Sequence, residues 1–255
     1  SVPYGAVGNN SFIFVGEKSQ SPVTVQFLML SLYPTVGLNS YAAKADTVLS
    51  FTGTDFGPEE EVKVFLNSTN APPVAVLKTD VTGAFQNAGS FLIPFELKGK
   101  HTFIFVGDKS QATTTTGFDV LPYTPSADPS TYGGRPGTSV TFYGAGFARN
   151  EIVRVFVGRG QGNSGKEVAC FKTNDQGAII GGGTGYTIRS GVEAGELVFS
   201  LVGDRSQATA LAAVEVMEAT GPVQSVGADE EKEYVCPHDT EVQNSEAPAR
   251  SASGQ

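Results

Sequence analysis

The chain carries few of the side chains that catalysis or metal binding needs at neutral pH. Its only histidines are His101 and His238, and its only cysteines are Cys170 and Cys236. His101 lies at the entrance of an expected strand, where a solvated turn is the ordinary interpretation. The peptide Cys236-Pro-His-Asp239 brings a thiol and an imidazole together, but a closed zinc site needs four ligands. We therefore expect no metal site there.

Two further patterns resemble chemical sites. Residues 181–185 read Gly-Gly-Gly-Thr-Gly, but no Lys-Ser/Thr pair closes the run and no helix signal follows it, so we interpret it as a loop between strands rather than a phosphate loop. The run Glu59-Glu-Glu61 and the turns at Asp108 and Asp204 bring up the hypothesis of calcium binding between repeats, because calcium takes several oxygen ligands. Because no Asp-x-Asp-x-Asp loop is present, we interpret these acidic residues as a solvated face.

No set of nucleophile, base and charge stabiliser can be assembled from these residues. The sequence therefore predicts a protein that is not an enzyme, with no catalytic residue, no cofactor and no bound metal. A lysine-to-asparagine cross-link is not expected at Lys18 or Lys63 either, because arginine occupies the matching positions 205 and 154.

Composition narrows the possible partners. The formal net charge is -9 and the charged fraction is 17%, so the clustered lysines and arginines that bind nucleic acid are lacking. The longest apolar run, near Phe27 to Leu32, is too short to span a bilayer. A first residue other than Met is expected for a processed or excised product. The abundance of Gly, Thr, Ser, Val and Phe favours short strands joined by turns.

Three near-identical peptides reveal an internal repeat, which decides the organisation of the whole chain. They read VGEKSQ from Val15, VGDKSQ from Val106 and VGDRSQ from Val202, with starts 91 and 96 residues apart. A spacing of this size is typical of one β-sandwich domain.

Two more signatures recur with similar offsets. Residues 51–65 match residues 142–156 at an offset of 91, and residues 74–79 match residues 168–173 at an offset of 94. The second match aligns Cys170 with Val76, which lies on an expected strand of the first repeat. We therefore interpret Cys170 as a small buried hydrophobe rather than a nucleophile. Whether it pairs with Cys236 stays open. Small insertions, such as residues 158–165, account for the growing offset.

Short β-branched or aromatic segments bounded by turn residues predict six or seven strands per repeat. The segments of the first repeat are residues 48–51, 62–66, 74–77, 91–97, 102–106 and 114–121. The fold class predicted is all-β, with tandem immunoglobulin-like β-sandwiches: two complete repeats plus an N-terminal partial repeat. Residues 137–147, Gly-Thr-Ser-Val-Thr-Phe-Tyr-Gly-Ala-Gly-Phe, resemble the opening of the IPT/TIG-type immunoglobulin-like repeats of bacterial extracellular surface proteins. The resemblance covers two repeats and implies an exported, non-catalytic spacer or binding module.

The phase of the repeat sets the expected domain limits. Repeat A covers residues 31–123 and repeat B residues 124–219, followed by an acidic, largely disordered tail over residues 220–255. Residues 1–30 match only the last two strands of a repeat, expected at residues 11–16 and 23–30. This hairpin would expose an apolar face unless another element covered it. Its face consists of Phe12, Phe14, Val25 and Phe27, which we predict to be assembly residues.

Two functions fit this organisation. In the first, the chain is a structural subunit of an extracellular fibre or surface layer, a homopolymer in which neighbouring chains complete the partial repeat. In the alternative, it is a fragment of a cell-surface adhesin array whose loops bind a glycan or a protein. Both place the protein at the cell surface or outside the cell.

Overall fold

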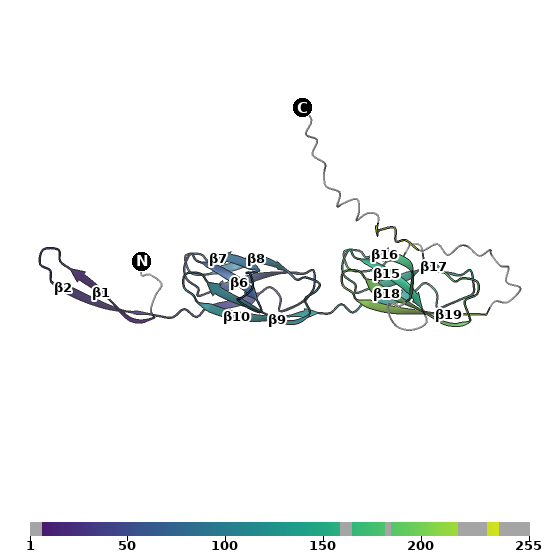
Figure 1. Ribbon diagram of the computed structural model, residues 1–255, viewed down its shortest axis with the longest axis horizontal. Coiled ribbons are helices and arrows are strands. Elements are labelled where there is room, and N and C mark those ends of the chain that lie inside the picture. The colour runs from purple at the N-terminus through teal and green to yellow at the C-terminus, as the bar shows by residue number, and fades with distance from the viewer. Residues whose placement is uncertain (1–6, 159–164, 182–184, 219–233, 240–255) are drawn as a thin grey trace, which may run out of the picture. The chain divides into compact units, whose positions relative to one another are not determined.

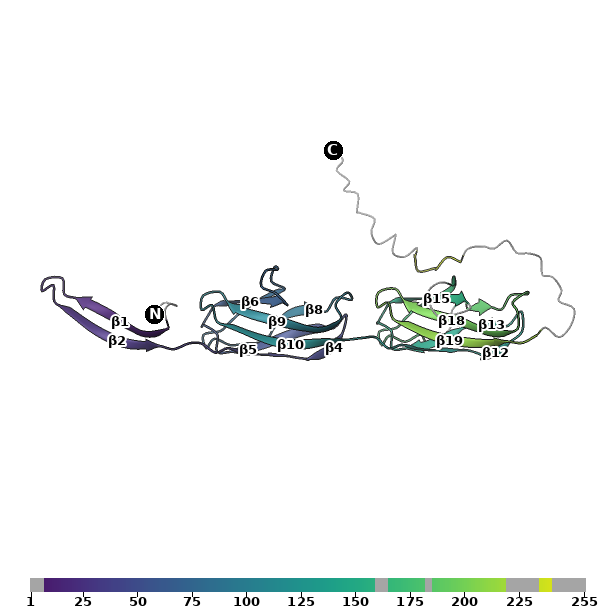
Figure 2. The same ribbon diagram turned by 60° about the horizontal axis from the view of Figure 1, so that its bottom comes forward.

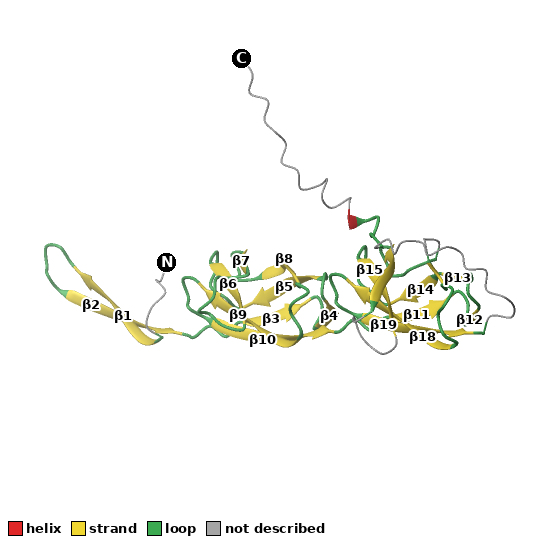
Figure 3. Cartoon of the chain, turned by 45° about the vertical axis from the view of Figure 1, so that its right-hand side comes forward, coloured by secondary structure: helices red, strands yellow, loops and turns green. Residues whose placement is uncertain are grey.

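In the computed structural model, residues 7–158, 165–181, 185–218 and 234–239 are described. Every named element in these residues is a strand, and the one helical segment drawn in Figure 3 is a short piece at residue 239. The chain divides into two units, residues 1–121 and 122–255. The strands of the first unit are β1 Gly8–Val15, β2 Pro22–Met29, β3 Thr35–Leu38, β4 Ala42–Lys44, β5 Val48–Thr54, β6 Glu61–Leu66, β7 Ala75–Lys78, β8 Phe85–Leu92, β9 Gly99–Gly107 and β10 Thr113–Leu121.

Repeat A is a sandwich of two sheets, formed by β3 to β10 (Figures 1 and 2). The larger sheet has the order β4-β10-β9-β6-β7, in which only the β4-β10 pair is parallel. The smaller sheet has the order β3-β5-β8. The fold class is therefore all-β, built from sandwich repeats, as the sequence predicted.

Alternation of side chains along the strands explains why these two sheets pack together. On β5, and on β9 from Phe103 onward, every second residue is buried, and the buried set includes Phe51, Phe103 and Phe105. Phe51 meets Phe103 and Phe105 edge to face, with ring centroids 5.1 and 5.5 Å apart. The core of repeat A is thus a cluster of phenylalanines between its sheets.

Repeat B has the same arrangement. Its strands are β11 Ser126–Pro129, β12 Gly133–Gly134, β13 Ser139–Val140, β14 Phe142–Ala145, β15 Ile152–Gly158, β16 Lys166–Lys172, β17 Tyr186–Thr187, β18 Gly195–Gly203 and β19 Thr209–Val216. The larger sheet runs β12-β19-β18-β15-β16, and the pairs β11-β14 and β13-β17 face it. Position by position this matches the larger sheet of repeat A, and again only the first pair is parallel.

Eight aromatic and β-branched residues in the matching signatures were predicted to be core residues, and all eight are buried. They are Phe51, Phe56, Val62, Val64, Phe142, Phe147, Val153 and Val155. One predicted strand, residues 91–97, is wrong because β8 ends at Leu92. Pro94 lacks the N–H that a continuing ladder needs, and the backbone of Ile93 instead bonds Thr47 and Asp46 in the preceding turn.

The hairpin of β1 and β2 forms a sheet of its own. Its eight paired positions run from Gly8 opposite Met29 to Val15 opposite Pro22. Within the described residues neither strand belongs to a larger sheet. Both faces of the hairpin are largely exposed.

We expect the replacement Phe147→Ala to lower the free energy of unfolding of repeat B by about 3 to 5 kcal/mol, because a nearly buried ring would leave a cavity. Tyr132→Ala, at a side chain that is 67% exposed, serves as the control and should change stability by less than about 1 kcal/mol. Urea denaturation checks both values. Equal losses for the two variants would contradict the burial of Phe147.

Candidate functional site

The predicted assembly residues lie together on one face of the hairpin. Phe12, Phe14 and Val25 are 45%, 60% and 50% exposed, and Phe27 is partly buried because its ring stacks on Phe12 at 4.9 Å. The four side chains form a contiguous apolar patch on this face, and exposed apolar patches can mark contact surfaces.

The hairpin has the geometry of the last two strands of repeat A. Adding 91 to each of its eight paired positions reproduces the eight pairs of β9 with β10, from Gly99 opposite Val120 to Val106 opposite Thr113. The stacked pair Phe12 and Phe27 corresponds to Phe103 and Phe118, whose ring centroids lie 4.6 Å apart. Phe103 is fully buried by the opposite sheet, and that burial is what the hairpin lacks.

The three repeated peptides form the same turn, as the sequence predicted. In each turn the glutamine has a positive φ, between 51° and 57°, and donates its backbone N–H to the glycine four residues earlier. The glutamine side chain also donates to the carbonyl of the acidic residue, at 2.8 Å for Gln20 and 2.7 Å for Gln111 and Gln207.

A buried glutamate before β6 holds this turn in repeat A. Glu60 is 0% exposed, so its interpretation as part of a solvated acidic face is wrong, although Glu59 and Glu61 are exposed. Its carboxylate accepts hydrogen bonds from Gly57 N–H at 2.6 Å, Lys109 N–H at 3.1 Å, Ser110 N–H at 2.8 Å and Ser110 Oγ at 2.6 Å. Four donors offset the loss of hydration that burying a charge would otherwise cost.

Repeat B contains the same arrangement around Glu151. Its carboxylate accepts from Ala148 N–H at 2.6 Å, Arg205 N–H at 3.2 Å, Ser206 N–H at 3.0 Å and Ser206 Oγ at 2.9 Å. In both repeats a buried threonine, Thr79 or Thr173, accepts the glutamate backbone N–H. We call the carboxylate and its four donors the glutamate clasp. The repeat offset of 91 between Glu60 and Glu151 was the sequence signal for it.

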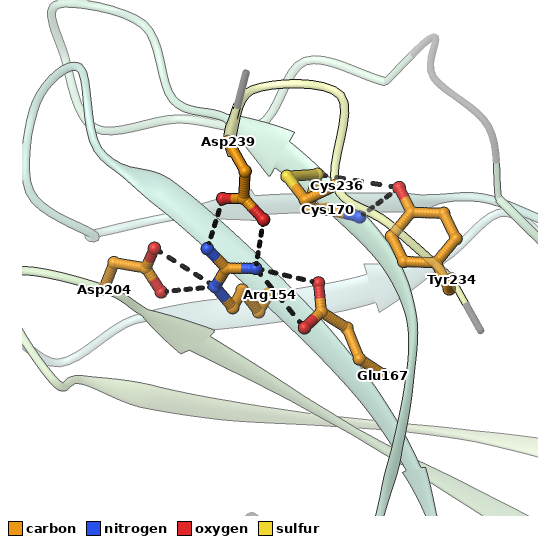
Figure 4. Close-up of a disulfide and its surroundings, with 7 residues drawn as sticks. All are labelled: Arg154, Glu167, Cys170, Asp204, Tyr234, Cys236 and Asp239. Carbon is orange, nitrogen blue, oxygen red and sulfur yellow. Dashed lines mark hydrogen bonds and ion pairs between the residues drawn. A yellow bond between two sulfur atoms is a disulfide. The ribbon is translucent and has the colours of Figure 1, made fainter. Parts of the chain in front are cut away.

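The second feature missed from the sequence is a disulfide between Cys170 and Cys236. Cys170 is 6% exposed, whereas the matching Val76 in repeat A is 53% exposed. Cys170 is therefore buried as predicted, but its cover is residues 234–239 and not the sandwich core alone (Figure 4). The Cys170 N–H on edge strand β16 donates to Tyr234 Oη at 3.1 Å, so the segment also satisfies part of the sheet edge.

Arg154 also holds residues 234–239, through its contact with Asp239. Its guanidinium donates to Asp239 Oδ1 at 2.6 Å, to Asp204 Oδ1 at 3.0 Å and to Glu167 Oε1 at 3.1 Å (Figure 4). Hydrogen bonding to Arg154 lowers the pKa of Asp239, whereas the pKa of Glu167 is raised, chiefly by burial, although Arg154 acts to lower it. We call residues 234–239, held by the disulfide and Arg154, the tail latch. The prediction of disorder for the rest of residues 220–255 lies outside the described residues.

The other residues considered from the sequence are His101 and the glycine-rich run 181–185. His101 lies within β9, where its ring nitrogens contact the Asn67 side chain and the Lys98 carbonyl at 3.0 and 3.1 Å. Gly181 and Gly185 are described, but residues 182–184 between them lie outside the described residues. In the described part of the chain no group of three His, Cys, Asp or Glu side chains is placed to hold a metal, and no helix there is long and apolar enough to cross a membrane.

We expect Glu60→Gln to lower the free energy of unfolding of the first unit by about 2 to 5 kcal/mol, because the amide replaces an acceptor of four donors with a group that itself donates. The control Glu61→Gln changes the adjacent exposed carboxylate and should cost less than about 0.5 kcal/mol. Thermal or urea unfolding measures both. A Glu60→Gln protein as stable as the control would contradict the clasp.

Reducing the disulfide should destabilise repeat B by up to about 4 kcal/mol, because cross-linking residues 66 positions apart restricts the unfolded chain. The measurement is urea unfolding of the wild type and of Cys236→Ser, each with and without reductant. Repeat A, which has no cysteine, provides the internal control. If neither the reductant nor the substitution changed the unfolding midpoint of repeat B, the disulfide would be shown to add no stability.

Comparison with known proteins gives limited similarity. No family model matches the chain, and no curated protein matches it. A tetra-tandem repeat in the extending region of a large adhesion protein is 17% identical over 82% of this chain and 56% of that chain, with a TM-score of 0.32. Trypsin-activated alpha-2-macroglobulin from Escherichia coli is 12% identical over 85% and 19%, with a TM-score of 0.28. The chain thus spans less than two thirds of either structure, and neither assigns it a family.

Proposed function

We propose that this chain is a non-enzymatic structural segment of an extracellular fibre or surface layer, in which strands of a neighbouring chain complete its N-terminal hairpin. One observation carries the proposal. The hairpin reproduces the register and ring stacking of β9 and β10, yet the face that these strands bury in repeat A is open in the hairpin.

Energetics favour completion of this face. A two-stranded hairpin is marginally stable in water, and it gains stability when a third strand or a second sheet covers its apolar side. Covering Phe12, Phe14 and Val25 to the extent seen for Phe103 and Phe105 would remove much of three large side chains from water. Each such side chain contributes roughly 1.5 to 3 kcal/mol when fully buried.

The disulfide supports an extracellular location. Bonds such as Cys170 to Cys236 form and persist in oxidising compartments and are rare in the cytosol. The bond joins residues 234–239 covalently to β16, the outer strand of the large sheet of repeat B.

What the proposal requires depends on which chain supplies the completing strands. Repeats A and B each already contain their own last hairpin, β9-β10 and β18-β19. An identical chain would therefore complete β1-β2 only by releasing one of these hairpins, as in domain swapping. A homopolymer of this chain thus requires an exchange of hairpins between copies.

Light scattering of the purified chain across a range of concentrations tests assembly. We expect the full chain to form larger species, and we expect both deletion of residues 1–30 and the double substitution Phe12→Ser/Phe14→Ser to abolish them. Ile13→Ser/Val15→Ser is the matched control, because these exposed residues lie on the other face of the same strand.

Two results would overturn the assembly proposal. The truncated chain could polymerise as well as the full chain, or the full chain could be a monodisperse monomer at every concentration. Either result would favour the alternative, a segment of an adhesin array whose loops bind a glycan or a protein.

A further inference from the structure

The turn of the N-terminal hairpin has the conformation of a glutamate clasp without the glutamate. Gln20 N–H donates to the Gly16 carbonyl at 2.8 Å, as Gln111 does to Gly107 at 3.0 Å. Ser19 Oγ accepts from Ser21 N–H at 3.4 Å, which corresponds to the 3.2 Å bond between Ala112 N–H and Ser110 Oγ. The donors of the turn are therefore already arranged before any carboxylate is bound.

In both complete repeats this turn binds a carboxylate. The two backbone N–H groups and the hydroxyl at positions 109 and 110 hold Glu60, and those at positions 205 and 206 hold Glu151. The matching groups of the hairpin belong to Lys18 and Ser19. In the described part of the chain, no acceptor is bonded to the backbone N–H of either residue.

The repeats also define how the missing strand would pair. In repeat A, β6 runs antiparallel to β9 with Val62 opposite Gly107 and Val64 opposite Phe105. Shifting these positions by 91 places the two valines opposite Gly16 and Phe14 of β1. The glutamate two residues before the first valine then reaches the turn.

From this geometry we propose that residues 16–20 are a binding site for a glutamate carboxylate, supplied by a strand of the pattern Glu-x-Val-Lys/Arg-Val-Phe from a neighbouring chain. The strand pairs antiparallel with β1, and its glutamate accepts hydrogen bonds from Lys18 N–H, Ser19 N–H and Ser19 Oγ. The inference deepens the proposed function, because it names the partner that completes the hairpin.

A second contact makes the pattern more specific. The acidic residue of the turn pairs with the basic residue of the strand in both repeats: Lys63 Nζ lies 2.6 Å from Asp108, and Arg154 Nε lies 3.0 Å from Asp204. Glu17 occupies this position in the hairpin. The backbone contact is also shared, since Asp108 N–H and Asp204 N–H donate to Glu61 and Ile152 carbonyls, each at 2.8 Å. The completing strand therefore presents a carboxylate to the turn and a cation to Glu17.

The test is a titration of the isotope-labelled full chain with a synthetic peptide of residues 57–66, GPEEEVKVFL, followed by the amide resonances in NMR spectra. We expect the Lys18 and Ser19 amides to shift as the peptide binds. The amides of Ser110 and Ser206 should stay in place, because their turns already hold Glu60 and Glu151.

Two matched peptides isolate the carboxylate. A Glu60→Gln peptide should bind about ten-fold more weakly, because hydrogen bonds to a charged carboxylate are stronger than those to a neutral amide. A Glu61→Gln peptide has the same net charge as the Glu60→Gln peptide, but it should bind with the affinity of the parent peptide. The substitution Ser19→Ala in the full chain should lower the affinity for the parent peptide and leave the affinity for the Glu60→Gln peptide unchanged. This coupling would not arise from a purely structural effect of Ser19 on the turn.

The possible outcomes separate this inference from the proposed function. Equal affinity of the Glu60→Gln and parent peptides would overturn the carboxylate site while leaving completion of the hairpin by apolar pairing intact. The absence of any shift at Lys18 and Ser19 would overturn the site whatever light scattering shows. Shifts confined to Ser110 or Ser206 would show exchange into the complete repeats and would also overturn it. Specific binding in a chain that stays monomeric would support the site and count against the homopolymer.

Discussion

A charge buried between two segments distant in sequence organises each repeat. Glu60 and Glu151 have almost no contact with water, and each is acceptable there only because four donors converge on its carboxylate. Three of those four donors come from a turn about fifty residues further along the chain. The carboxylate therefore links the start of β6 to the end of β9 in repeat A, and the start of β15 to the end of β18 in repeat B, and it sets the register of each pair.

This constraint explains why the turn peptide recurs almost unchanged while the strands around it vary. Glycine begins the turn, serine supplies two of the donors, and glutamine takes the positive φ that reverses the chain. The acidic residue between them lies on the surface and pairs with Lys63 or Arg154. A half-exposed pair of this kind contributes little stability, so we attribute to it the choice of partner strand rather than the strength of the pairing.

The two repeats differ at the outer edge of the large sheet. In repeat A the edge strand β7 exposes Val76, whereas in repeat B the tail latch covers the matching residue and Arg154 gains Asp239 as a further partner. An open edge strand offers unpaired backbone groups to other chains. The latch removes part of that hazard from repeat B, whereas the N-terminal hairpin keeps Phe12, Phe14 and Val25 exposed.

The sequence by itself determined the all-β fold, the equivalence of the three turns and the core phenylalanines, because these depend on local alternation and on offsets that a repeated sequence displays directly. It also placed Phe12, Phe14, Val25 and Phe27 on one hairpin face. Only the tertiary structure showed that Glu60 is buried while Glu59 and Glu61 are exposed, since the repeat offset matches Glu60 to Glu151 but the burial depends on a turn distant in the sequence. For the same reason it alone paired Cys170 with Cys236: the path of the tail across the sheet edge is a matter of long-range packing, which no local pattern encodes.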